Sequence, residues 1–197
     1  MKNGRWMVAI LGLLAAAASG TAGAQDRGIY LGGSWGQAEY ADTCDDIALV
    51  TGCKDNDTAW RFFAGYQFNR NLALELGYAD LGIVRAEGTF LGTPTRFIGE
   101  VKGFDLAGVL SFNVVDRLSA FAKLGGYRMR TTVDVNFGGT DTRDGETNSG
   151  LTYGLGLGYD LWKLGVRLEW QRYDNVGGGS TGEDTIDFFS IGALLRF

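Results

Sequence analysis

The chain contains no histidine, one proline and two cysteines among its 197 residues. Without histidine it cannot form a Ser-His-Asp triad, a Cys-His pair or a histidine-ligated metal site. These absences remove the residue types on which many hydrolases and metalloenzymes depend. We therefore predict a protein that is not an enzyme and that binds neither a cofactor nor a metal ion.

Basic residues are outnumbered as well, with 18 Lys and Arg against 23 Asp and Glu, a formal net charge of −5. Nucleic-acid binding needs a basic surface, so we expect no nucleic acid among the partners. Glycine is abundant at 32 residues, and aromatic residues make up 13% of the chain. Disordered chains are poor in aromatic residues, so this composition favours a folded domain.

Long hydrophobic runs are missing, and the longest apolar segment, residues 7–18, lies near the start. Lys2 and Arg5 precede it, and an Ala22-Gly23-Ala24 site follows. Twelve residues are too few to span a bilayer, whereas this order of features is typical of a cleaved secretory signal peptide. We predict a signal peptide over residues 1–24 and one domain over residues 25–197.

The mature part alternates apolar and polar residues with a period of two, which indicates β-strands. The eight runs lie near 28–40, 59–69, 71–84, 100–114, 118–135, 151–161, 164–175 and 186–197. Short connections alternate with long polar ones, at 41–58, 85–99, 136–150 and 176–185. This alternation predicts a meander of hairpins, and an even number of strands can close without leaving an edge.

The two faces of these strands differ in chemistry, and the difference predicts whether the outward face meets lipid or water. One face carries large aliphatic and aromatic residues, while the opposite face carries glycine, serine and charges. Four residues break the pattern of the small and charged face: Phe63, Phe121, Phe188 and Leu194. A barrel in lipid places its apolar face outward. We predict an all-β fold, an eight-stranded antiparallel up-and-down transmembrane barrel; the alternative, a soluble barrel, would expose the glycine-rich face to water.

Four segments carry a family resemblance: "FFAGYQFNRNLALELGYADLG", "LSAFAKLGGY", "GVRLEW" and the final "SIGALLRF". They resemble the OmpA-like eight-stranded barrels of bacterial outer membranes. Because the chain stops at Phe197 without a peptidoglycan-binding domain, it is more similar to the small stand-alone, OmpX-like barrels. The resemblance implies the outer membrane of a Gram-negative cell, with both termini and the short turns in the periplasm and the long loops outside.

The same resemblance implies a role for the final strand. It would be the signal that the outer-membrane assembly machinery recognises, after periplasmic chaperones have delivered the chain, with Phe197 and Leu195 as its main residues. The alternative is that Phe197 is only an aromatic residue of the membrane-interface girdle.

Charged residues on the inward parity must pair, because an unpaired charge in a poorly hydrated interior is costly. The cations are Arg61, Lys123, Arg167 and Arg196, and the carboxylates are Glu75, Asp105 and Glu169. The resemblance implies that Glu75 and Arg167 form a central pair. It also places Lys123 beside them, bound to Glu169 or Asp105, because Gly158 stands where the family can carry an acid. The network is either a structural plug or a gate whose members exchange partners.

Two further sets of residues carry hypotheses. Cys44 and Cys53 lie in one long loop, where an oxidising compartment favours a disulfide over a two-thiol metal site. Lys102, Arg128, Arg130 and Arg172 lie on the lipid-facing parity near the long-loop ends of their strands. There they would contact lipopolysaccharide phosphates; the alternative is that they extend to water without a specific partner.

We therefore predict an integral outer-membrane barrel with a role in envelope integrity and a small gated conductance as an additional hypothesis. Its partners would be outer-membrane lipid and lipopolysaccharide. The alternative is a surface protein whose loops bind a host surface or a phage.

Overall fold

The structure is a computed structural model that describes residues 27–41, 50–54, 56–90, 93–137, 140–177 and 183–197. Within these ranges the chain forms nine strands: β1 Gly28–Tyr40, β2 Val50–Lys54, β3 Asn56–Gln67, β4 Leu72–Phe90, β5 Thr93–Val115, β6 Leu118–Phe137, β7 Thr140–Leu161, β8 Leu164–Gly177 and β9 Glu183–Arg196. No helical segment in the described ranges has the length and hydropathy that a bilayer crossing requires.

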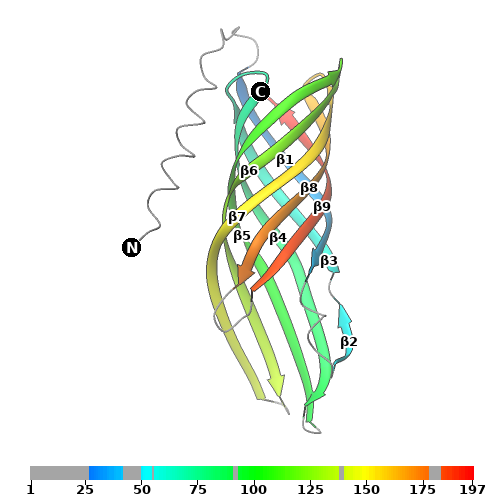
Figure 1. Ribbon diagram of the computed structural model, residues 1–197, viewed down its shortest axis with the longest axis vertical. Coiled ribbons are helices and arrows are strands. Elements are labelled where there is room, and N and C mark those ends of the chain that lie inside the picture. The colour runs from blue at the N-terminus through cyan, green and yellow to red at the C-terminus, as the bar shows by residue number, and fades with distance from the viewer. Residues whose placement is uncertain (1–26, 42–49, 55, 91–92, 138–139, 178–182) are drawn as a thin grey trace, which may run out of the picture.

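Eight of these strands form a closed antiparallel barrel, seen from the side in Figure 1. Strand β1 pairs with β3 on one side and with β9 on the other, from Tyr30 opposite Arg196 to Tyr40 opposite Ile186. The ladder continues through β4 to β8, so every barrel strand has two neighbours. In hydrocarbon each backbone polar group needs a partner, and closure supplies it. The predicted eight-stranded barrel is confirmed.

Two hairpins extend the sheet well past the barrel at the long-loop end (Figure 1). Strands β4 and β5 stay paired to Phe90 opposite Thr93, and β6 and β7 to Phe137 opposite Thr140. The short strand β2 adds to the outer part of β4. Most of the segments 85–99 and 136–150, which we expected to be loops, are therefore strands. They show no apolar alternation because a hairpin in water needs no buried face.

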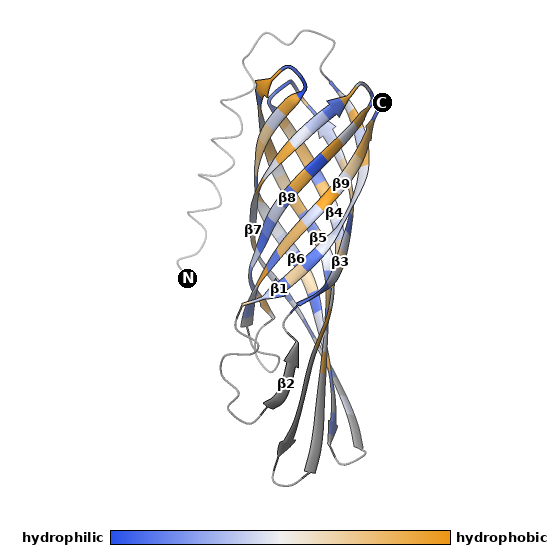
Figure 2. Ribbon diagram, turned by 90° about the vertical axis from the view of Figure 1, so that its right-hand side faces the viewer, coloured by the Kyte–Doolittle hydropathy of each residue, from blue (hydrophilic) through white to orange (hydrophobic). Residues whose placement is uncertain are grey.

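Hydrophobic and hydrophilic residues alternate along the barrel strands (Figure 2), and the outward face is apolar, as the alternation predicts. Large exposed side chains cover it on every barrel strand, among them Leu31, Trp35, Phe62, Leu76, Phe104, Leu124, Leu155, Leu168 and Ile191. Soluble proteins rarely expose a continuous apolar surface of this kind. The belt is the surface that a bilayer requires of a spanning barrel.

Large inward side chains fit into the barrel because glycine lies opposite them. The directly opposed pairs are Tyr30 with Gly65, Phe63 with Gly32 and Phe121 with Gly156. A Cβ atom added at Gly65 would lie 2.0 Å from the Tyr30 ring, and one at Gly32 would lie 2.4 Å from the Phe63 ring. Two of the three aromatic residues that interrupt the polar face, Phe63 and Phe121, are therefore accommodated by glycines of a neighbouring strand, whereas Phe188 lies opposite Ala38 and Gln171.

Two apolar layers cross the interior at different heights. The short-turn layer consists of Tyr30, Phe63, Ala73, Val109, Phe121 and Leu194. The long-loop layer consists of Ala38, Tyr40, Ala59, Ala79, Leu81, Val84, Val101, Tyr127, Met129, Tyr173, Val176, Ile186 and Phe188. Both layers are built from inward positions of the barrel strands, and they frame the charged residues between them.

Candidate functional site

Six charged side chains meet inside the barrel between the two apolar layers. Five strands supply them: Arg61 from β3, Glu75 from β4, Asp105 from β5, Lys123 from β6, and Arg167 and Glu169 from β8. Each occupies an inward position of its strand, and all six are buried. The alternation of the strands therefore converts scattered charges in the sequence into one cluster.

Glu75 is the centre of this cluster. Its Oε1 accepts hydrogen bonds from Nη1 of Arg61 at 2.8 Å and from Nζ of Lys123 at 2.6 Å. Its Oε2 accepts from Nη1 of Arg167 at 3.0 Å and from the hydroxyl of Tyr30 at 3.1 Å. One carboxylate on β4 thus holds three cations and a phenol from four other strands, β1, β3, β6 and β8.

The other two carboxylates complete the charge balance. Asp105 accepts two hydrogen bonds from Arg61, from Nε at 2.9 Å and from Nη2 at 2.6 Å. Glu169 accepts from Nζ of Lys123 at 2.6 Å and from Nη1 of Arg167 at 3.4 Å. Each cation therefore contacts two carboxylates, and three positive charges face three negative ones. Such complete pairing is what makes burial of these charges tolerable.

The aromatic rings of the short-turn layer stabilise the cations from one side. The guanidinium carbon of Arg167 lies 4.3 Å from the centroid of the Phe63 ring, and that of Arg61 lies 5.2 Å from the same centroid. The ammonium group of Lys123 lies 6.0 Å from the Phe121 ring. Cation–π contacts at these distances are favourable, more so where water is excluded.

On the long-loop side a thin polar layer follows the network. Nε2 of Gln171 donates to Oγ1 of Thr152 at 2.9 Å, and both side chains are fully buried. The long-loop apolar layer continues beyond them, with Tyr173 and Phe188 among its members. A partner exchange within the network would therefore leave the apolar layer beyond it in place.

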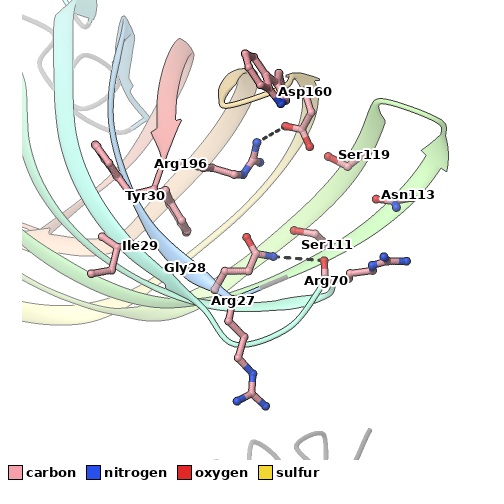
Figure 3. Close-up of a pocket in the computed structure, with 13 residues that line it drawn as sticks. Arg27, Gly28, Ile29, Tyr30, Arg70, Ser111, Asn113, Ser119, Asp160 and Arg196 are labelled. Atoms are coloured by element: carbon pink, nitrogen blue, oxygen red, sulfur yellow. Dashed lines mark hydrogen bonds and ion pairs between the residues drawn. The ribbon is translucent and has the colours of Figure 1, made fainter. Parts of the chain in front are cut away.

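The structure brings together the six residues named for the interior network, and Glu75 contacts Arg167 as the resemblance implies. Lys123 takes Glu169, one of its two expected partners. Arg196 does not join: its Nη1 donates to Oδ1 of Asp160 at 2.6 Å near the short-turn mouth, where both side chains are partly exposed. Arg196 is the last residue of β9, and Asp160 holds its guanidinium group at the mouth (Figure 3).

Sequence reasoning missed Tyr30 as a member of the network. Its inward position follows from the parity of β1, so the signal was present. The Tyr30 hydroxyl reaches Glu75 across Gly65. This glycine on β3 lies opposite Tyr30 on β1 and opposite Glu75 on β4, and it has no side chain to block the contact. That dependence requires the register between β1, β3 and β4, which the sequence alone does not supply.

The four outward cations do not form a single cluster. Arg172 on β8 is bound to Asp187 through Nε at 2.8 Å and Nη2 at 2.6 Å, and Nε1 of Trp170 also donates to Asp187. Lys102 on β5 pairs with Glu100 at 2.8 Å. Arg128 and Arg130 on β6 are exposed, and in the described part of the chain neither forms an ion pair.

Two sets of predicted residues remain to be placed. Cys44 lies outside the described residues, and the side chain of Cys53, whose backbone lies in β2, does as well, so their disulfide stays a prediction. Leu195 points outward on β9 opposite Leu31, and Phe197 follows the end of the strand. The backbone N–H of Phe197 donates to the carbonyl of Ile29 at 2.9 Å, which continues the ladder by one bond.

The network predicts a steep dependence of stability on Glu75. Replacing Glu75 with Gln leaves three buried cations facing two carboxylates, and we expect the free energy of unfolding to fall by about 3–5 kcal/mol. The matched control is Asp160→Asn, which breaks the partly exposed pair with Arg196 and should cost no more than about 1 kcal/mol. Urea unfolding in lipid vesicles measures both, and equal midpoints for the two variants would contradict the central role of Glu75.

Comparison with known proteins matches this arrangement. The model of the OmpA-like transmembrane domain family matches residues 24–197. Outer membrane protein A of Serratia marcescens is 30% identical over 185 residues, covering 88% of this chain and 50% of that protein. Outer membrane protein P5 of Haemophilus influenzae is 33% identical, covering 83% of this chain and 49% of that protein. The chain spans about half the length of the curated relatives it matches.

Solved structures share the fold at low sequence identity. Ail of Yersinia pestis superposes with a TM-score of 0.55 at 13% identity, covering 88% of this chain and 100% of Ail. Neisserial surface protein A superposes with a TM-score of 0.54 at 15% identity, covering 86% of this chain and 97% of that structure. The closed barrel, its buried charges and the match over residues 24–197 agree: this chain belongs to the OmpA-like transmembrane domain family of outer-membrane β-barrels.

Proposed function

We propose that the protein is a structural outer-membrane barrel whose interior is closed at rest, with both termini and the short turns in the periplasm. The observation that carries this proposal is the filling of the interior. Two apolar layers and a balanced ion network cross it one after another. An eight-stranded barrel has an interior just wide enough for side chains, so these layers leave no wide water path.

Closure of this kind suits a protein that supports the envelope without weakening its permeability barrier. Glu75 ties five strands together through its bonds to three cations and to the Tyr30 hydroxyl, and the aromatic residues of the short-turn layer sit against glycines of the neighbouring strands. Both features resist separation of the strands in the plane of the membrane. The relatives that share the family are outer-membrane proteins, which supports the location.

A gated conductance is the finer hypothesis for the same interior. Arg167 contacts both Glu75 and Glu169, so its guanidinium group has two acceptors between which it can shift. Such a shift would open the network only as far as the long-loop layer. We therefore place the dominant barrier to ions in that apolar layer and not in the ion pairs.

Single-channel recording in planar bilayers tests this placement. We expect Arg167→Ala to conduct no more than the wild type, because the long-loop layer still blocks the axis. Met129→Ala combined with Phe188→Ala thins that layer and should conduct more than Arg167→Ala, although the short-turn layer still narrows the path. Leu155→Ala, on the outward face, is the control, and a heat-dependent gel shift verifies folding of each variant. Larger currents in Arg167→Ala than in the double variant would place the barrier in the ion pairs.

The projecting sheet supports a second candidate function, binding of a partner at the cell surface. Pairing of β7 with β8 begins at Thr152, so among the described strands the outer part of β7 pairs with β6 alone. An edge strand of this kind can accept a strand from another protein. Ail, which shares the fold, is described as an attachment and invasion protein. The same sheet here would meet a host surface or a phage.

Shortening the two projecting hairpins separates this candidate from the structural role. Removing residues 86–97 and 134–143 trims β4 to β7 beyond the barrel rim and leaves the ion network untouched. If the sheet binds a partner, we expect cells carrying the trimmed protein to lose adhesion to host cells while their resistance to detergent stays at the wild-type level. Adhesion at the wild-type level would exclude the sheet as the binding surface.

Two of the four outward cations have carboxylate partners, which leaves Arg128 and Arg130 as the candidate residues for contact with lipopolysaccharide. Arg172 already has a carboxylate partner, and so does Lys102. Arg128 lies opposite Phe104, and Arg130 lies opposite Lys102, so the two guanidinium groups share the lipid-facing surface of β5 and β6 at the long-loop end. Arginine recognises phosphate oxygens with paired hydrogen bonds.

The double variant Arg128→Ala, Arg130→Ala should therefore retain less lipopolysaccharide during purification than the wild type. Arg172→Gln is the matched control, and we expect it to retain as much as the wild type because Asp187 occupies Arg172 already. Quantifying phosphate of lipid A per mole of protein makes the comparison. Equal retention by all three proteins would show that these cations extend to water without a specific partner.

The last strand supports a proposal on assembly. Phe189, Ile191 and Leu195 lie on its outward face, and Phe197 continues the alternation past Arg196. We assign to this pattern the recognition of the unfolded chain by the outer-membrane assembly machinery, after transport by periplasmic chaperones. In the folded barrel the same strand pairs with β1 and closes the sheet.

A further inference from the structure

An apolar groove of about 560 Å³ lies on the outward face of the barrel, across β1, β9, β8 and β7. Gln37 lines it and has the only side-chain amide there, which is exposed. Glu169 and Ser190 border the groove, but their side chains are buried in the barrel. The volume lies within the range of small-molecule sites. The walls are large apolar side chains: Trp35, Leu157, Leu168, Trp170, Phe189 and Ile191.

The strand register places this groove next to a polar row of side chains. The groove row consists of Trp35, Ile191, Leu168 and Leu157, which lie opposite one another on adjacent strands. The next outward row toward the long loops consists of Gln37, Phe189, Trp170 and Leu155, and the polar row after it consists of Glu39, Asp187, Arg172 and Tyr153. Successive outward rows are about 7 Å apart along a strand. The groove thus ends where the outward surface changes from apolar to polar.

The polar row carries an unbalanced negative charge. Nε and Nη2 of Arg172 bind Asp187, and the indole of Trp170 donates to the same carboxylate. Glu39 lies opposite Asp187 and is exposed, and its carboxylate has no hydrogen bond or ion pair with the described residues. Like charges directly opposite each other on a sheet are unfavourable. Two carboxylates therefore share one cation, and one negative charge remains without a partner.

Membrane lipid is the partner that this face meets, because the groove is continuous with the apolar belt of an outer-membrane barrel. An acyl chain supplies the apolar group for the groove. The unpaired carboxylate of Glu39 attracts a positively charged headgroup and repels an anionic one. A primary ammonium group has three N–H donors for this carboxylate, whereas a quaternary ammonium group has none. The chemistry of the row therefore selects a headgroup with a primary ammonium group.

We propose that the groove binds a phospholipid with an ethanolamine headgroup. One acyl chain lies between Trp35 and Trp170, the side-chain amide of Gln37 donates to an ester carbonyl, and the ammonium group binds Glu39 while the phosphate faces water. The two polar contacts are one outward row apart, about 7 Å, which the glycerophosphate part of such a lipid can bridge. The bound lipid neutralises Glu39 at the edge of the hydrocarbon, where an unpaired charge is costly.

This site is separate from the proposed lipopolysaccharide contact. Arg128 and Arg130 lie on β6 and their positive charge suits phosphates, whereas the polar row lies on β1, β9, β8 and β7 and has excess negative charge. The leaflet from which the lipid comes rests on the proposed function, which places the long loops outside the cell. Binding itself does not rest on it. A conducting barrel would leave the binding measurement unaffected, and failed binding would leave the closed barrel in place.

Paramagnetic broadening of NMR signals in phosphatidylcholine nanodiscs tests the proposal on the folded wild-type protein. A trace of phosphatidylethanolamine with a nitroxide on its acyl chain is added, and phosphatidylcholine and phosphatidylglycerol with the same label are compared with it. Trp35, Leu168 and Ile191 report the groove, while Leu76 and Leu106, exposed on β4 and β5, report the lipid belt elsewhere. We expect the groove signals to broaden more than the reference signals with the ethanolamine lipid, less so with the choline lipid and least with the glycerol lipid.

Glu39→Gln removes the carboxylate that would hold the ammonium group. It should lower the preference of the groove for the ethanolamine lipid about threefold, the size expected for one exposed charged pair. Asp116→Asn is the matched control, because it removes an exposed carboxylate at the short-turn end, and it should keep the wild-type preference. Equal losses in the two variants would reduce the effect to net charge and overturn the proposal.

Filling the groove tests the place of the acyl chain. Ile191 and Leu76 are both about half exposed on the outward face, so the barrel has room for a larger side chain at either position. Ile191→Trp should abolish the preference at Trp35 and Leu168, whereas Leu76→Trp should keep it. A heat-dependent gel shift verifies folding of each variant, and a preference that survives Ile191→Trp would contradict an acyl chain in the groove.

The headgroup comparison in the wild type decides the proposal without any variant. Equal relative broadening of the groove by the ethanolamine and choline lipids would show that the headgroup is not recognised, and would overturn it. Weaker broadening in the groove than at Leu76 and Leu106 with all three lipids would show that a second copy of the chain or another protein covers the groove, and would overturn it as well.

Discussion

Closure of eight strands into a narrow barrel is the constraint from which the rest of the structure follows. The bilayer requires that every strand has two neighbours, which the pairing of β1 with β9 completes. Closure with eight strands then limits the interior to the volume of side chains. Near the short turns, the large inward residues Tyr30, Phe63 and Phe121 each lie opposite a glycine, which leaves room for their rings.

The same lack of space determines how the charges are arranged. There is no room for bulk water around a buried carboxylate, so each charge must find its partners among side chains. Three cations and three carboxylates meet this condition, with Glu75 shared by all three cations. Arg196 lies outside this balance because its strand ends at the mouth, where it pairs with Asp160 and both side chains are partly exposed. The six charges are neutral as a unit and lie between two layers of buried apolar residues.

The alternation of apolar and polar residues along each strand predicts most of this architecture. In a barrel of one sheet, successive residues point alternately into the interior and toward the membrane. It places Glu75, Lys123 and Arg167 inside and Leu31 or Leu168 outside without any knowledge of register. It does not find the projecting parts of β4 to β7, since hairpins in water need no apolar face. It also misses contacts such as Arg172 with Asp187 or Tyr30 with Glu75. These depend on which residues of adjacent strands lie side by side, and small shifts of register would change them.

The central claim is that side chains fill the interior between the short-turn mouth and the projecting sheet. The reactivity of introduced cysteines toward a water-soluble thiol reagent measures this directly. Single cysteines at Ser119, which lines the mouth, and at Ala107, which faces inward beside Glu75, are placed in a background with Cys44 and Cys53 replaced by Ser. A small charged methanethiosulfonate reagent is added to the protein in nanodiscs, which expose both ends of the barrel. The closed barrel predicts rapid modification at position 119 and none at position 107 while the protein stays folded. Modification of both positions at similar rates would show that water and ions pass the short-turn layer, and would contradict the claim.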